Sequence, residues 1–103
     1  MFATQTQKLI EDAIANELQN ARVTYGNNYN SLHEGYSVLK EEIEEAQEEL
    51  NRALETLGEL WTDTKAQSEK DVKSDASSIA FDAYYLALEA CQIAAVCKKI
   101  IGD

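Results

Sequence analysis

Apolar residues recur at intervals of three and four along most of the chain, which is the spacing of one face of an α-helix. The first such segment predicts a helix from about Thr4 to Arg22, with apolar positions Ile10, Ala13, Ile14, Leu18 and Ala21. The stretch VTYGNNYNS follows, and its glycine and three asparagines indicate a loop. Ser31 precedes Glu34 by three residues, so we expect a capping box in which Ser31 caps a second helix and Glu34 reaches back.

Two longer segments carry an unbroken alternation of three and four. The second helix should begin near Leu32 and pack through Tyr36, Leu39, Ile43, Ala46, Leu50, Ala53, Leu57 and Leu60. After a polar turn, DTKAQSEKD, a third helix should begin near Asp71 and pack through Val72, Ala76, Ile79, Ala83, Leu86, Ala90, Ile93, Cys97 and Ile100. Lys98 and Lys99 suit the negative end of its dipole. The small residues of this stripe favour a close antiparallel hairpin with the second helix.

The predicted fold is all-α, a single domain over residues 1–103. It comprises three main helices, a long antiparallel hairpin plus an N-terminal helix. The chain has no proline and only four glycines, as is typical of long helices. A hairpin buries one stripe per helix and leaves Phe81, Tyr84, Leu88 and Ala95 outside it. We therefore expect a helical bundle completed by oligomerisation, most simply as a homodimer.

Charge and composition narrow the class of protein. The net charge of -10 argues against direct binding to a nucleic-acid backbone, which needs clustered lysine and arginine. Cys91 and Cys97 are spaced so that they point to different faces of one helix, which favours small buried thiols in a reduced, cytoplasmic protein. No secretory signal is visible at the N-terminus. Asp82 and Glu89 interrupt the most apolar run, 79–96, so we expect no membrane span.

Six of the ten residues from Glu41 to Leu50 are glutamates. On a helix, like charges three or four residues apart cost about 0.2–0.5 kcal/mol per pair. The run divides into two groups on either flank of the apolar stripe. One group holds Glu42, Glu45 and Glu49, and the other holds Glu41, Glu44 and Glu48. Either group is explained by a solvated face, and Glu44 and Glu48 are expected to be solvated.

The third helix places carboxylates beside its own packing stripe. Asp82 and Glu89 lie on or next to it, and Gln92 lies further round on the same flank. Buried carboxylates are costly unless they are paired or bind a metal. Together with Glu42 and Glu45 from the second helix, these oxygen ligands suit Mg²⁺ or Mn²⁺. The alternative is that Asp82 and Glu89 pair with arginine or lysine from the first helix or from a second subunit.

Two blocks, SLHEGYSVLKEEIEEAQEEL and ALEACQIAAVCKKI, resemble the MazG-like proteins of phages and prophages. These proteins are similar to the all-α nucleoside triphosphate pyrophosphohydrolases, in which EExxE on one helix and ExxD on the next hold Mg²⁺. The resemblance implies that Glu42 and Glu45 of the first motif, and Glu89 of the second, are metal ligands and catalytic residues. Gln92 stands where that pattern has aspartate, which should lower the metal affinity, and Asp82 lies one heptad before Glu89 and could compensate.

The resemblance implies hydrolysis of a nucleoside triphosphate to a monophosphate and pyrophosphate by a metal-activated water. Tyr25, Asn28, Asn30 and His33 would then contact the base or sugar of the nucleotide substrate. His33 is equally explained as a helix-start residue that makes an ordinary hydrogen bond. A second hypothesis is a non-catalytic helical-bundle phage protein that binds a protein partner. A third, a coiled-coil structural element, fits the heptads but not the polar groups within the third helix.

Overall fold

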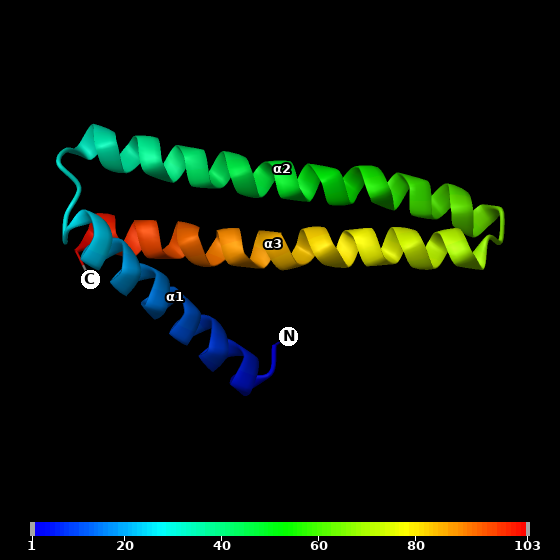
Figure 1. Cartoon of the computed structure of the whole chain (residues 1–103), viewed down its shortest axis with the longest axis horizontal. Helices are drawn as coiled ribbons and strands as arrows, with labels where there is room; N and C mark the ends of the chain where they lie inside the picture. Colours follow the sequence, from blue (N-terminus) through cyan, green and yellow to red (C-terminus); the bar gives the residue numbers. More distant parts are fainter. Residues whose placement is uncertain (1, 103) are drawn as a thin grey trace. The chain divides into compact units, whose positions relative to one another are not determined.

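The computed structural model describes residues 2–102 and contains three helices in this range, α1 (Thr4–Tyr25), α2 (Leu32–Lys65) and α3 (Glu69–Ile101). The chain is all-α, as predicted, and α2 and α3 pack against each other as an antiparallel pair joined by a short turn (Figure 1). The predicted start of α2 at Leu32 is confirmed. Helix α1 runs one turn beyond its predicted end and stops at Gly26, which has a positive φ of 92°.

The connection between α2 and α3 is shorter than predicted. The polar stretch 63–71 was expected to hold the turn, but only residues 66–68 lie outside the two helices. Gln67 adopts a left-handed backbone with a φ of 55°, which reverses the chain direction within these three residues. The Ser68 hydroxyl donates to Asp71 Oδ2 at 2.8 Å, at the start of α3. The polar residues on both sides of the turn belong to the solvated ends of α2 and α3. Polar residues are compatible with a helix there, so the polar stretch was longer than the turn.

The start of α2 carries the predicted serine cap. The backbone N–H of Glu34 donates to Ser31 Oγ at 3.1 Å, so the N-cap is confirmed. The reciprocal bond differs from the expected capping box. The Glu34 carboxylate reaches past Ser31 to Asn30, where it accepts the backbone N–H and the side-chain Nδ2–H, both at 3.1 Å. The loop is therefore tied to the first turn of α2 through Asn30.

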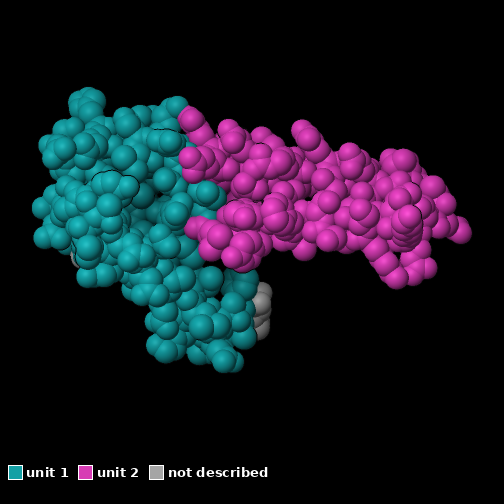
Figure 2. Space-filling view, viewed as in Figure 1, with its two compact units in different colours: residues 1–43, 89–103 teal, residues 44–88 magenta. Residues whose placement is uncertain are grey.

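The chain forms two compact units, which Figure 2 shows in different colours. The first comprises residues 1–43 with 89–103, and the second comprises residues 44–88. In the first unit, Cys91, Ala95 and Lys99 of α3 are buried, and both cysteines are free thiols. Gly35 is buried as well, and a Cβ there would lie 3.2 Å from Ile100 Cγ1. The absence of a side chain at this position lets α2 approach α3 closely.

The packed face of α2 differs from the predicted stripe by one residue. Half of the stripe is partly buried as expected, namely Leu39, Ala46, Ala53 and Leu60. The other half is exposed, namely Tyr36, Ile43, Leu50 and Leu57. The inward positions next to them are taken by Glu42, Glu49 and Thr56, each one residue earlier in the chain. The predicted stripe is therefore wrong at every second position.

Helix α3 shows the same displacement. Its partly buried positions include Val72, Ile79, Leu86 and Ile93, whereas Ala76, Ala83 and Ala90 are exposed. Asp75, Asp82 and Glu89, again one residue earlier, turn inward instead. Alanine buries little apolar area, so exposing three alanines costs little free energy and does not fix the rotation of the helix. The outcome is a row of carboxylates at heptad spacing along the packed face.

By length and composition alone, α3 would also suffice to cross a membrane. The core helix of a soluble protein satisfies the same criterion, so this property is weak evidence. The expectation of no membrane span rests on Asp82 and Glu89, two of the inward carboxylates of α3.

Candidate functional site

The structure brings together the three glutamates that the sequence singled out as metal ligands. One carboxylate oxygen from each of Glu42, Glu45 and Glu89 lies within 4.8 Å of the others. Glu45 follows Glu42 by three residues on α2, so the two share one side of that helix. One oxygen of Glu42 and one of Glu89 are shielded from solvent. We call these three residues the carboxylate group. Glu44 and Glu48, on the other flank of α2, are exposed as expected.

Three carboxylates this close oppose one another's ionisation, and a bound cation is one arrangement that relieves this repulsion. Oxygen-only ligands suit hard divalent cations. Opposite ligands of one Mg²⁺ are separated by about 4.2 Å, twice the usual Mg–O distance. The oxygens of the carboxylate group are thus close enough for two or three of them to reach one ion after small side-chain adjustments, with water completing the shell.

Asp82 has a partner within the second unit. It is buried, and Arg52 Nε of α2 lies 4.0 Å from its Oδ1. Arg52 also forms an ion pair with Glu49, so one guanidinium serves two inward carboxylates. A buried carboxylate beside a guanidinium is the paired arrangement that the sequence analysis held as the alternative for Asp82. The arginine comes from α2 rather than from α1 or a second subunit.

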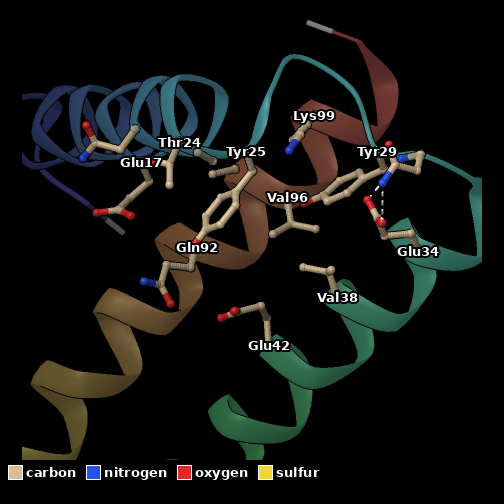
Figure 3. A pocket seen from close by; sticks show the side chains of 14 residues that line it. Glu17, Thr24, Tyr25, Tyr29, Glu34, Val38, Glu42, Gln92, Val96 and Lys99 are labelled. Carbon is tan, nitrogen blue, oxygen red and sulfur yellow. Dashed lines mark hydrogen bonds between the residues drawn. The ribbon is translucent and has the colours of Figure 1, made fainter.

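A cavity of about 730 Å³ lies in the first unit (Figure 3). Its walls come from the second half of α1, the α1–α2 loop, the start of α2 and the end of α3. The lining combines aromatic rings, amides, three carboxylates, one lysine and small apolar side chains. The lining residues are Glu17, Asn20, Ala21, Thr24, Tyr25, Tyr29, Asn30, Glu34, Val38, Glu42, Gln92, Ala95, Val96 and Lys99. Its size and mixed lining are those of a small-molecule site.

Glu42 belongs both to the cavity wall and to the carboxylate group. Gln92, the residue at the aspartate position of the resembling motif, also lines the cavity. Of the predicted substrate-binding residues, Tyr25 and Asn30 line it as well. His33 is exposed in the first turn of α2 and is not among the lining residues that the structure describes. A molecule in this cavity would therefore contact the edge of the carboxylate group.

The sequence analysis missed the role of Lys99. This side chain is only 3% exposed, and its Nζ lies 4.2 Å from the centroid of the Tyr29 ring, a cation–π contact. Burial, followed by the negative charges of Glu34, Glu42 and Cys97, raises the pKa of Tyr29, so its hydroxyl stays protonated. One sequence signal was available, because Lys99 follows Gln92 by two helical turns and so shares its face of α3.

Glu42 thus lines the cavity of the first unit and is also one of three glutamates whose carboxylate oxygens lie within 4.8 Å of one another. The resemblance to the MazG-like proteins rests on the two sequence blocks quoted above. Comparisons of the chain with protein-family models, with curated proteins and with solved structures found no match.

Proposed function

We propose that this chain is a MazG-like, Mg²⁺-dependent nucleoside triphosphate pyrophosphohydrolase of phage or prophage origin. The reaction consumes one water, breaks the bond between the α- and β-phosphates, and releases a nucleoside monophosphate and pyrophosphate. The observation that carries the proposal is the position of Glu42. This residue lines the cavity and also lies within 4.8 Å of carboxylate oxygens of Glu45 and Glu89. A phosphate chain in the cavity would thus end beside the carboxylate group.

Glu42, Glu45 and Glu89 would hold the Mg²⁺ or Mn²⁺, with the neutral oxygen of Gln92 as a further candidate ligand. When bound, such a cation neutralises phosphate charge and lowers the pKa of a coordinated water. The chain itself supplies position. Glu42 and Glu45 are three residues apart on α2, so helical geometry holds their carboxylates on one side of that helix.

Tyr25 and Asn30 are proposed to contact the base or sugar. Both line the cavity, and Asn30 donates its backbone N–H and its side-chain Nδ2–H to the Glu34 carboxylate. Aromatic faces stack on bases of any sequence, and an amide can both donate and accept hydrogen bonds. His33 lies three residues after Asn30 and keeps its proposed substrate role only if a bound nucleotide extends beyond the lining residues.

We further propose a cytoplasmic homo-oligomer, most simply a dimer. On α2, Ile43, Leu50 and Leu57 are about half exposed, and Leu54 and Trp61 are more exposed still. Burying a large apolar side chain stabilises a protein by about 1.5–3 kcal/mol. A second copy that covers this row would complete the thin core of the chain.

The same apolar row favours a second candidate function, a non-catalytic helical bundle that binds a protein partner. Gln92 points in the same direction, since it replaces a charged ligand with a neutral one. The two candidate functions differ in one respect. The hydrolase requires an intact carboxylate group to bind the cation. The partner-binding protein does not, because it would use the apolar row on the exposed side of α2.

A hydrolysis assay tests the proposal. The purified chain is incubated with the four ribonucleoside and four deoxyribonucleoside triphosphates in Mg²⁺ or Mn²⁺, and the products are separated by ion-exchange chromatography. We expect a monophosphate and pyrophosphate, abolished in Glu42→Gln and retained in Glu44→Gln, whose side chain is exposed. Gln92→Asp, which restores the motif of the resembling family, should raise the rate. Cleavage of no nucleotide by either the native chain or Gln92→Asp would contradict the proposal and favour the partner-binding protein.

A further inference from the structure

The hairpin repeats the pattern of the carboxylate group one heptad further along. A step of seven residues turns an α-helix by about 700°, so it returns to nearly the same face. Because α2 and α3 are antiparallel, the step runs forwards from the carboxylate group on α2 and backwards on α3 (Figure 1). It leads to Glu49, Arg52 and Asp82, which we call the arginine group. Arg52 takes the position that Glu45 has in the carboxylate group.

The guanidinium of Arg52 contacts both other members of the arginine group. It forms an ion pair with Glu49, and its Nε lies 4.0 Å from Asp82 Oδ1. Asp82 is buried, and a buried carboxylate is costly unless a positive charge lies beside it. A guanidinium stays protonated in proteins, so Arg52 supplies this charge permanently. The arginine group therefore contains its own cation.

The two groups differ at a single position, and this difference decides what each can bind. A hard divalent cation requires oxygen ligands. A guanidinium has five N–H donors and no acceptor, so it cannot be such a ligand. Its positive charge repels a metal ion and occupies the carboxylates of Glu49 and Asp82. Glu45, at the matching position, instead contributes an oxygen to the carboxylate group.

We infer that Arg52 excludes a divalent cation from the arginine group, so that of the two groups only the carboxylate group binds one. The inference rests on the cation of the proposed function and adds a positioning role for Arg52. It assigns Asp82, a candidate metal ligand by its spacing from Glu89, to Arg52 instead. The functional consequence is that the cation is directed to the group that shares Glu42 with the cavity.

Counting bound Mn²⁺ tests the inference without any nucleotide. The chain is titrated with Mn²⁺, and the free ion is measured by its electron paramagnetic resonance signal. We expect one Mn²⁺ per native chain. Arg52→Glu gives the arginine group three carboxylates and should bind one Mn²⁺ more than the native chain. Lys73→Glu makes the same change of charge at an exposed position of α3, in a pair with Glu69, and should bind as many ions as the native chain.

The outcomes separate the inference from the proposed function. A folded Arg52→Glu that binds no more Mn²⁺ than the native chain overturns the role of Arg52 and leaves the hydrolase standing. An equal gain in Lys73→Glu also overturns it, because net charge rather than position would then be responsible. A native chain that binds no Mn²⁺ overturns both, since the inference requires a cation at the carboxylate group.

Asp82→Asn provides a second measurement if circular dichroism shows that Arg52→Glu does not fold. We expect this variant to bind the same number of Mn²⁺ ions as the native chain, with the same affinity, because Asp82 contacts Arg52 rather than a metal. Loss of a bound Mn²⁺ in folded Asp82→Asn would make Asp82 a metal ligand and would overturn the role of Arg52.

Discussion

Asp63 of α2 and Asp75 of α3 bring their carboxylates together within the second unit, close enough to share a hydrogen bond when one of them is protonated. Two carboxylates can form such a bond only when one of them carries a proton. This bond, followed by burial and by the negative charges of Asp63, Glu59 and Asp71, raises the pKa of Asp75 from 3.8 to about 6. The pair belongs to the row of inward carboxylates at heptad spacing, so the displaced packing of α2 and α3 has an electrostatic consequence.

The raised pKa makes the stability of the chain depend on pH. In the folded state Asp75 takes up its proton near pH 6, whereas in the unfolded state it does so near 3.8. The folded state therefore binds more protons between these values, and Asp75 destabilises the fold above pH 6 and ceases to do so as the pH falls towards 4. We expect Asp75→Asn to melt at a higher temperature than the native chain at pH 7.5, with the difference shrinking clearly by pH 4.5 and vanishing only below the unfolded-state pKa of 3.8.

Thermal melts followed by circular dichroism across this pH range measure the difference. Asp12→Asn is the control, because Asp12 lies on α1 in an exposed pair with Lys8. A melting temperature of Asp75→Asn that stays parallel to that of the native chain from pH 7.5 to 4.5 would show that Asp63 and Asp75 share no proton.

The cap of α2 gives a second prediction. Ser31→Ala removes the acceptor of the Glu34 N–H and should destabilise the chain by about 1 kcal/mol. Ser31→Asp keeps an acceptor at this position and should melt close to the native chain. Denaturant unfolding of the three proteins checks this. Equal stability of Ser31→Ala and the native chain would show that Ser31 does not stabilise the start of α2.

The exposed apolar row on α2 predicts a dimer in solution. Light scattering after size exclusion at micromolar concentration should give twice the mass of 11.5 kDa. Leu50→Glu places a charge in the middle of the row and should shift the mass to that of the monomer, whereas Glu48→Gln, on an exposed site two residues away, should not. A native chain that elutes as a compact monomer would contradict the proposed dimer.

Much of the fold could be predicted because it depends on local rules. Ser31 caps α2 through a bond to a residue three positions away, so the sequence alone locates the helix start. The rotation of α2 and α3 is not local. Ile43 and Glu42 are 100° apart on the helix. Which of the two residues faces α3 depends on the whole surface that α3 presents to α2. Alanines in the α3 stripe left that choice open, and the predicted rotation was wrong.

The candidate site divides in the same way. Helical periodicity placed Glu42 on one flank of the α2 stripe and Glu89 beside the α3 stripe, whereas the place of Glu45 rested more on the resemblance to the MazG-like proteins. The environment of Lys99 depends on Tyr29, a loop residue 70 positions earlier in the chain, and no periodicity relates the two. The charge of Lys99 at the end of a helix suggested only a contact with the helix dipole, because nothing in its neighbourhood in the sequence indicates a cavity.

The central claim is that Glu42, Glu45 and Glu89 hold a divalent cation, and a melt with added metal tests it most directly. Three nearby carboxylates repel one another, so a cation that binds only the folded state should raise the melting temperature by mass action. We expect millimolar Mn²⁺ to raise it in the native chain and in Glu44→Gln, and to leave it unchanged in Glu45→Gln and Glu89→Gln. A native melting temperature that Mn²⁺ does not change would contradict the claim.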